Sequence, residues 1–131
     1  MNRNYELRDK IIFGKYDPKS YSGGCRHFSC DYATMKELVD QNFIELDECQ
    51  NCSPNTKDFM ETLADVDDVS FTAYAISPDR DDYRVTIEGA EITIPDTDFD
   101  TITFLVESLH YADTFNFQHE GSKYYLHVWW D

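Results

Sequence analysis

The first half of the chain shows apolar positions at helical spacing. Residues 34–37 (TMKE) form a capping box, which predicts a helix from Thr34, the expected N-cap, to about residue 41. Ser53-Pro54 predicts a second helix start, because proline is favoured at the first helical position, and we expect this helix to run to about residue 64. Residues 5–13 fit a short strand and a short helix equally well.

The second half of the chain has the alternation of a sheet. Residues 69–77 are rich in β-branched and aromatic side chains, and residues 83–88 alternate between apolar and polar. Gly89-Ala90 predicts a break, after which 91–94 resumes as a strand. Residues 99–109 carry apolar side chains at helical spacing, and two closing strands are expected near 114–118 and 123–130. Short turns between successive strands favour antiparallel pairing, so we predict an α+β fold with a mainly antiparallel sheet and about three helices.

Composition supports one folded domain. The chain has 131 residues, with 41% hydrophobic and 15% aromatic residues, which excludes a disordered protein. No linker or repeat interrupts it, so residues 1–131 are predicted to form a single domain. Within it, residues 1–57 contain the cysteines and two predicted helix starts, and residues 58–131 form an acidic, sheet-rich part.

Charge narrows the possible partners. The 11 Lys and Arg residues against 26 Asp and Glu give a net charge of −15. Residues 1–57 contribute 8 − 9 = −1 and residues 58–131 contribute 3 − 17 = −14. Such a chain lacks the basic surface needed to bind nucleic acid directly or to dock on an anionic membrane. No apolar leader or membrane-length apolar run occurs, so we expect a cytoplasmic protein, with a monomer favoured.

The four cysteines form the strongest candidate for chemistry. Cys25 and Cys30 are separated by four residues, and Cys49 and Cys52 by two. Clustered thiols in a reducing compartment favour metal binding over disulfides, and two such pairs can supply the four soft ligands that zinc prefers. We therefore predict a structural zinc in a knuckle-like N-terminal half, with His27 as a possible substitute ligand. Free buried thiols and disulfides remain alternatives.

Acidic residues gather at three predicted turns or helix ends, around residues 65–68, 79–82 and 96–100. Surface carboxylates at such spacing can imitate the phosphates of a nucleic-acid backbone and contact a basic partner. A solvated acidic face that serves solubility is the alternative. The residues predicted to contact the partner are Asp79, Asp81, Asp82, Asp96, Asp98 and Asp100.

No catalytic motif accompanies these features. The chain lacks a glycine-rich phosphate loop, an HExxH motif and a nucleophile elbow. His110 beside Tyr111, and His119 beside Glu120, are ordinary neighbours. We therefore predict a binding protein without catalytic residues, and a small metal-dependent enzyme is the less favoured alternative.

Small size, strong acidity, the absence of enzyme motifs and the cluster Cys25/Cys30/Cys49/Cys52 together resemble the zinc-binding anti-CRISPR proteins that inhibit Cas9. The resemblance implies a phage-encoded protein of the bacterial cytoplasm that binds Cas9 stoichiometrically and prevents target DNA from being loaded or cut. Cas9 is highly basic where it holds nucleic acid, which suits an acidic partner. A DNA-mimic inhibitor of a restriction enzyme and an immunity protein against a toxin nuclease are the alternatives with the same physical basis.

Overall fold

The computed structural model describes all 131 residues. The helices are α1 (Tyr5–Phe13), α2 (Tyr32–Asp40), α3 (Thr56–Thr62) and α4 (Phe99–Leu109), with a short 3-10 helix at Pro18–Tyr21. The strands are β1 (Cys25–Asp31), β2 (Asp68–Ile76), β3 (Val85–Pro95), β4 (Thr114–Glu120) and β5 (Lys123–Trp129). None of the helices has the length and apolar character needed to cross a membrane.

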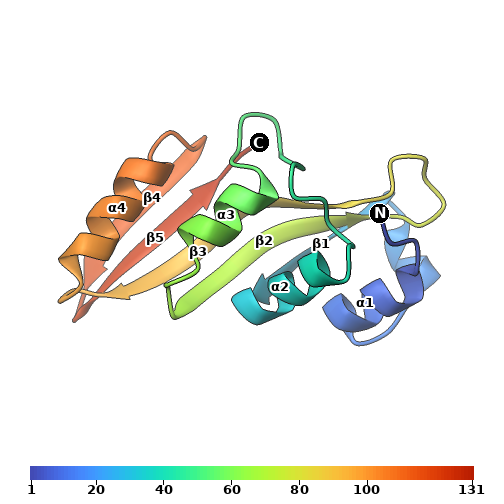
Figure 1. The fold of residues 1–131 in the computed structure, drawn as a ribbon, viewed down its shortest axis with the longest axis horizontal. Coiled ribbons are helices and arrows are strands. Elements are labelled where there is room, and N and C mark those ends of the chain that lie inside the picture. The colour runs from blue at the N-terminus through green and yellow to red at the C-terminus, as the bar shows by residue number, and fades with distance from the viewer.

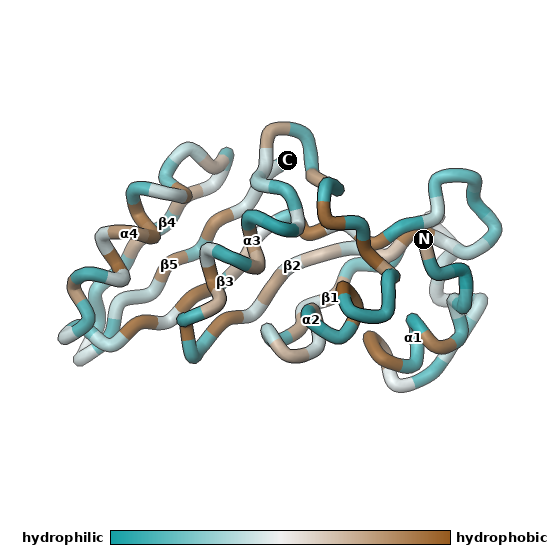
Figure 2. The backbone as a smooth tube through the Cα atoms, in the orientation of Figure 1, coloured by the Kyte–Doolittle hydropathy of each residue, from teal (hydrophilic) through white to brown (hydrophobic).

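The five strands form one sheet in the order β1-β2-β3-β5-β4, and every neighbouring pair is antiparallel. Helices α2, α3 and α4 lie over one face of this sheet (Figure 1). Hydrophobic segments of β3 and β5 run beneath them, and the outer turns of the helices are hydrophilic (Figure 2). The core lies between the two layers, where Phe59 of α3 packs against Phe71 of β2 and against Trp130.

The predicted fold class is confirmed, with four α-helices in place of about three. The two predicted helix starts, at Thr34 and at Ser53-Pro54, are wrong by a few residues. The α2 N-cap is Asp31, whose carboxylate accepts a hydrogen bond of 2.8 Å from the Thr34 amide, so Thr34 lies inside the helix. The α3 N-cap is Asn55, whose side chain accepts from the Asp58 amide. Both are Asx side chains, which rank at least as high as Ser and Thr at this position.

The break predicted at Gly89-Ala90 is wrong, because β3 runs without interruption from Val85 to Pro95. Gly89 lies where the strands approach closely: a Cβ there would overlap the Val128 carbonyl and lie 2.9 Å from Thr72 Oγ1. The register of β2 against β3 shifts between Thr72 and Ala73. Glycine therefore allows close packing beside a bulge and does not end the strand.

Helix α1 is fixed to the sheet by a buried polar cluster that sequence patterns did not reveal. The side chains of Arg8 and Asp9 are fully buried and joined by an ion pair of 2.9 Å. Arg8 also donates to the carbonyl of Ile76, the last residue of β2, and to the Tyr21 hydroxyl, which donates to Asp9 at 2.6 Å. Burial and the Asp9 hydrogen bond raise the pKa of Tyr21, so its hydroxyl keeps its proton at neutral pH.

Candidate protein-binding surface

The structure does not bring the four cysteines together. Cys25 and Cys30 lie at the two ends of β1, five residues apart, so their side chains point to opposite faces of the sheet. At about 3.3 Å per residue their Cα atoms are roughly 16 Å apart. Nowhere in the chain do three His, Cys, Asp or Glu side chains gather closely enough to hold a metal ion. The residues of the first predicted knuckle form a strand paired with β2, and zinc binding by the four cysteines stays a prediction.

The two cysteine pairs differ in their surroundings. Cys30 packs against the hydrophobic core, and burial, followed by the nearby Asp31 charge, raises its pKa to about 12. Cys49 and Cys52 are exposed in the loop between α2 and α3, where the Cys49 thiol lies 3.5 Å from the Asn51 carbonyl. This loop reaches the face of the sheet opposite the helices, which we call the uncovered face. There Glu48 accepts a hydrogen bond of 3.2 Å from Thr86 of β3. The exposed pair is the part of the predicted zinc site that remains adjacent and accessible.

The predicted acidic face is divided between the two ends of the sheet. Residues 79–82 lie in the turn between β2 and β3, and residues 96–100 span the β3–α4 connection and the start of α4. These connections lie at opposite ends of β3, as Figure 1 shows. Since β3 has 11 residues, its ends are roughly 33 Å apart at about 3.3 Å per residue. The two clusters therefore form separate surfaces.

Arginines balance the charge at the β2–β3 turn. Asp82 forms ion pairs of 2.8 Å with Arg80 and 3.2 Å with Arg84. Burial alone would raise the pKa of Asp82, but hydrogen bonds from both arginines outweigh it and lower the pKa. Asp79 accepts a hydrogen bond from Ser77, and Asp81 is exposed. The turn holds three aspartates against two arginines, a net charge of 2 − 3 = −1.

The opposite end of the sheet collects two clusters that are far apart in the sequence. Asp68 is paired with Thr93 across β2 and β3, which places the α3–β2 connection beside the β3–α4 connection. Asp65 and Asp100 line one hollow of about 310 Å³ between α3 and α4. We call this region the acidic end. Its six aspartates are Asp65, Asp67, Asp68, Asp96, Asp98 and Asp100.

The carboxylates of the acidic end have few cationic neighbours. The only Lys or Arg after residue 84 is Lys123, which lies opposite Glu120 in the β4–β5 pairing. In the β3–β5 pairing Lys123 lies opposite Pro95, the residue before Asp96, so it is the one such cation of this half of the chain at the acidic end. Asp96 lies 3.1 Å from His119 Nε2, and Asp98 caps α4 by accepting from the Thr101 amide. Since five of the six aspartates are exposed and Asp96 is half-buried, their charge is available to a partner.

Aromatic side chains accompany these carboxylates. Phe99 and Phe104 of α4 are 67% and 52% exposed, which is unusual for phenylalanine on a short amphipathic helix. Phe104 lines the hollow that contains Asp65 and Asp100. Large exposed apolar side chains within a charged rim are the composition of many protein-binding surfaces. The helical periodicity of residues 99–109 alone does not reveal that two of its phenylalanines face solvent.

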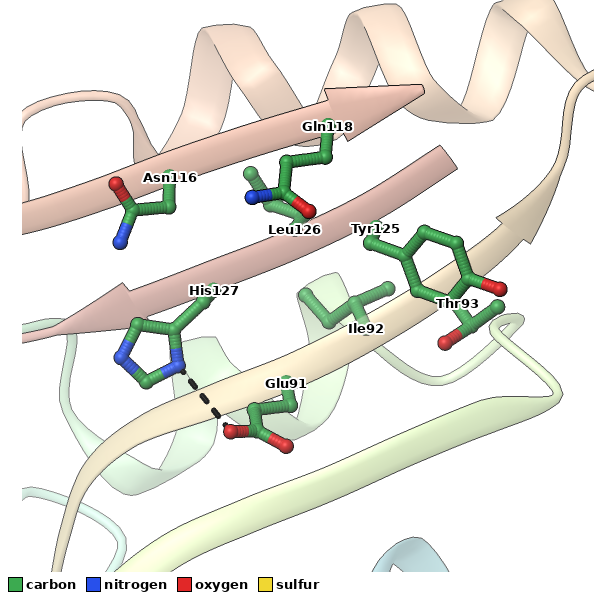
Figure 3. A pocket seen from close by; sticks show the side chains of 8 residues that line it. All are labelled: Glu91, Ile92, Thr93, Asn116, Gln118, Tyr125, Leu126 and His127. Atoms are coloured by element: carbon green, nitrogen blue, oxygen red, sulfur yellow. Dashed lines mark ion pairs between the residues drawn. The ribbon is translucent and has the colours of Figure 1, made fainter. Parts of the chain in front are cut away.

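The uncovered face of the sheet carries a second, polar hollow of about 250 Å³ (Figure 3). Glu91 of β3 and His127 of β5 form an ion pair of 3.5 Å within it, and Asn116 and Gln118 of β4 lie nearby. Tyr125 extends over its edge and is 40% exposed. This arrangement can bind polar groups through a carboxylate, an imidazole and two amides.

Comparisons of the chain with protein-family models, with curated proteins and with solved structures found no match. The acidic end combines an excess of carboxylates over basic side chains with exposed aromatic side chains.

Proposed function

We propose that the protein is a stoichiometric inhibitor of a bacterial nucleic-acid-handling enzyme, and that it acts as an anti-CRISPR protein which binds Cas9 and blocks target DNA loading or cleavage. The observation that carries the proposal is the acidic end, where six aspartates from two distant segments lie together and no Lys or Arg occurs between residues 85 and 122. The protein acts by binding and performs no chemistry on its target.

Electrostatics makes such a surface suited to a nucleic-acid channel. Cas9 holds its guide–target duplex in a positively charged channel and recognises the backbone through its shape and charge. Carboxylates held on the ends of packed helices and strands can replace backbone phosphates on that surface. Complementary charge also speeds association, and this acceleration falls as salt screens the charges.

The exposed aromatic side chains can add affinity that charge alone does not supply. A charged rim contributes mainly to the association rate, whereas apolar side chains that become buried on binding contribute most of the affinity. Phe99 lies between Asp98 and Asp100 in the sequence, and Phe104 shares a hollow with Asp100. Both phenylalanines are exposed and available for such burial. The acidic end thus offers carboxylates that speed association and phenylalanines that can strengthen the complex once bound.

Titration of the inhibitor against a fixed concentration of Cas9 and guide RNA tests the proposal. Inhibition of DNA cleavage should rise with the molar ratio and level off once the binding site is filled. Guide-free and guide-loaded Cas9 are tested side by side, and a mobility-shift assay measures target-DNA binding. Inhibition at substoichiometric amounts that grows with time would indicate an enzyme instead.

If neither form of Cas9 makes a complex at micromolar concentration and cleavage is unaffected, the Cas9 proposal is abandoned. The same acidic surface would then be tested against restriction enzymes and toxin nucleases, which also hold nucleic acid on basic surfaces.

A further inference from the structure

The two edges of the sheet are protected to different degrees. At the β1 edge, Phe13 of α1 packs on Phe28, and the Arg26 guanidinium lies 3.7 Å from the centre of the Phe13 ring. At the other edge, β4 pairs only with β5, in an uninterrupted register. The sequence of β4, TFNFQHE, contains none of the lysines, prolines or bulges that usually prevent an edge strand from pairing.

An apolar groove of about 320 Å³ lies beside this open edge, between α4 and the β4–β5 hairpin. Phe99 and Val106 line it from α4, and Phe117 and Tyr124 line it from the strands. The Phe117 and Tyr124 rings lie 5.4 Å apart, and Phe117 is 44% exposed. The groove is therefore a preformed apolar surface that is partly open to solvent.

Carboxylates surround the groove. Glu107 of α4 lies in its lining, and Asp96 lies at one end, where it contacts His119. On the opposite face of the same edge, Glu120 of β4 is exposed. Charge complementarity therefore favours an occupant that is basic as well as apolar, and disfavours an acidic one such as a second copy of this chain, whose net charge is −15.

We propose that the groove and the free edge of β4 together bind an extended basic segment of the partner protein as a sixth strand. A strand added there would lie about 4.8 Å from β4, and every second side chain would point to the α4 side of the sheet. Apolar side chains at those positions reach the groove beside Phe117. The alternate positions lie on the face of β4 that carries Glu120, where Lys or Arg is favoured.

This inference rests on the proposed function for the identity of the partner, but its geometry is testable without Cas9. The probe is the peptide Lys-Val-Lys-Leu-Lys-Val-Lys with blocked ends, which has the required alternation. Two control peptides accompany it: one with serine at the three apolar positions, and one with N-methyl groups on alternate backbone nitrogens, which removes strand hydrogen bonds. Binding is followed through the amide resonances of the protein.

Two matched variants of the protein locate the site. Phe99→Ala removes an exposed side chain from the groove, and Phe104→Ala removes an exposed side chain of the same type from the other side of α4. Unchanged amide spectra of the free variants confirm their fold. We expect the peptide to change resonances in β4 and α4 only. The Phe99→Ala variant should bind the peptide at least fivefold more weakly, whereas Phe104→Ala should change the affinity less than twofold. Both control peptides should bind at least tenfold more weakly.

Equal binding of the serine peptide would reduce the interaction to non-specific charge attraction and overturn the proposal. Resonance changes on the uncovered face of the sheet, or no binding by any peptide, would overturn it too. The two proposals fail separately. Peptide binding without a Cas9 complex removes the proposed function alone, and a Cas9 complex that is insensitive to Phe99→Ala removes the groove as its docking site.

Discussion

The two ends of the sheet both carry clustered aspartates, but only at the β2–β3 turn do neighbouring arginines offset most of their charge. At the β2–β3 turn, Arg80 and Arg84 hold Asp82, and the buried Arg8–Asp9 pair reaches the end of β2 directly beneath. At the acidic end, two clusters from distant segments meet beside exposed aromatics. Local charge in a sequence is therefore a poor measure of the charge that a partner can reach, since the fold decides which carboxylates are paired.

We expect the free energy of unfolding to depend on the end of the sheet at the β2–β3 turn, where the buried Arg8–Asp9 pair lies. Arg8→Met breaks the buried ion pair and leaves the Asp9 charge without its partner, so the free energy of unfolding should fall by about 3–5 kcal/mol. Lys10→Met, at an exposed position of the same helix, is the control and should change it by no more than about 0.5 kcal/mol. Urea unfolding measures both. Equal effects of the two variants would contradict the structural role of the cluster.

The cysteines of the exposed loop and Cys30 of the sheet should differ in thiol reactivity. At pH 8, Cys49 and Cys52 should react with a thiol reagent first, and Cys30 roughly a hundredfold more slowly, because its pKa is about 12 and it is buried. Mass spectrometry of the labelled protein measures the order. Rapid labelling of Cys30 would mean that β1 opens readily.

The same reagent tests the zinc prediction. One zinc on all four cysteines would give near-equimolar metal in the purified protein, protect Cys25 and Cys49 alike, and make Cys49→Ser lower the melting temperature sharply. That outcome requires a rearranged β1, because the paired strand holds Cys25 and Cys30 on opposite faces. Metal-free protein that is fully stable would support free thiols.

A smaller loss of stability is expected on substitution of Asp31, whose carboxylate accepts a hydrogen bond from the Thr34 amide. Hydrogen bonds from the Thr34 side chain and backbone lower its pKa. Because the folded-state pKa is below the unfolded one, the stabilisation is present above the unfolded value of about 3.9 and is lost as pH falls through the folded value. Asp31→Ala should cost about 1 kcal/mol at pH 7, and Asp31→Asn much less, since Asn also caps helices.

Thermal unfolding at pH 7 and at pH 2.5 measures these two variants. The difference between the native chain and Asp31→Asn should shrink at the lower pH. A cost for Asp31→Ala that does not change with pH would contradict the assignment of Asp31 as an ionised cap.

The regular elements of this fold could be predicted from sequence because their signals are local. Helix α4 and strands β2, β4 and β5 follow the periodicity of their own residues. Strand β1 could not be predicted this way: its residues, CRHFSCD, have little strand preference and are ordered by pairing with β2. The proximity of Asp65 to Asp100 and the burial of Arg8 also depend on contacts between distant segments.

The central claim is that the acidic end, and not the β2–β3 turn, contacts the basic partner. Two triple variants test it most directly: Asp96→Asn/Asp98→Asn/Asp100→Asn, which keeps an Asn cap on α4, and Asp79→Asn/Asp81→Asn/Asp82→Asn. The association rate of each with guide-loaded Cas9 is measured across a salt series. We predict that the first variant associates at least tenfold more slowly at low salt, with a weaker salt dependence, while the second changes the rate less than threefold. A larger effect of the second variant, or equal effects of both, would contradict the account.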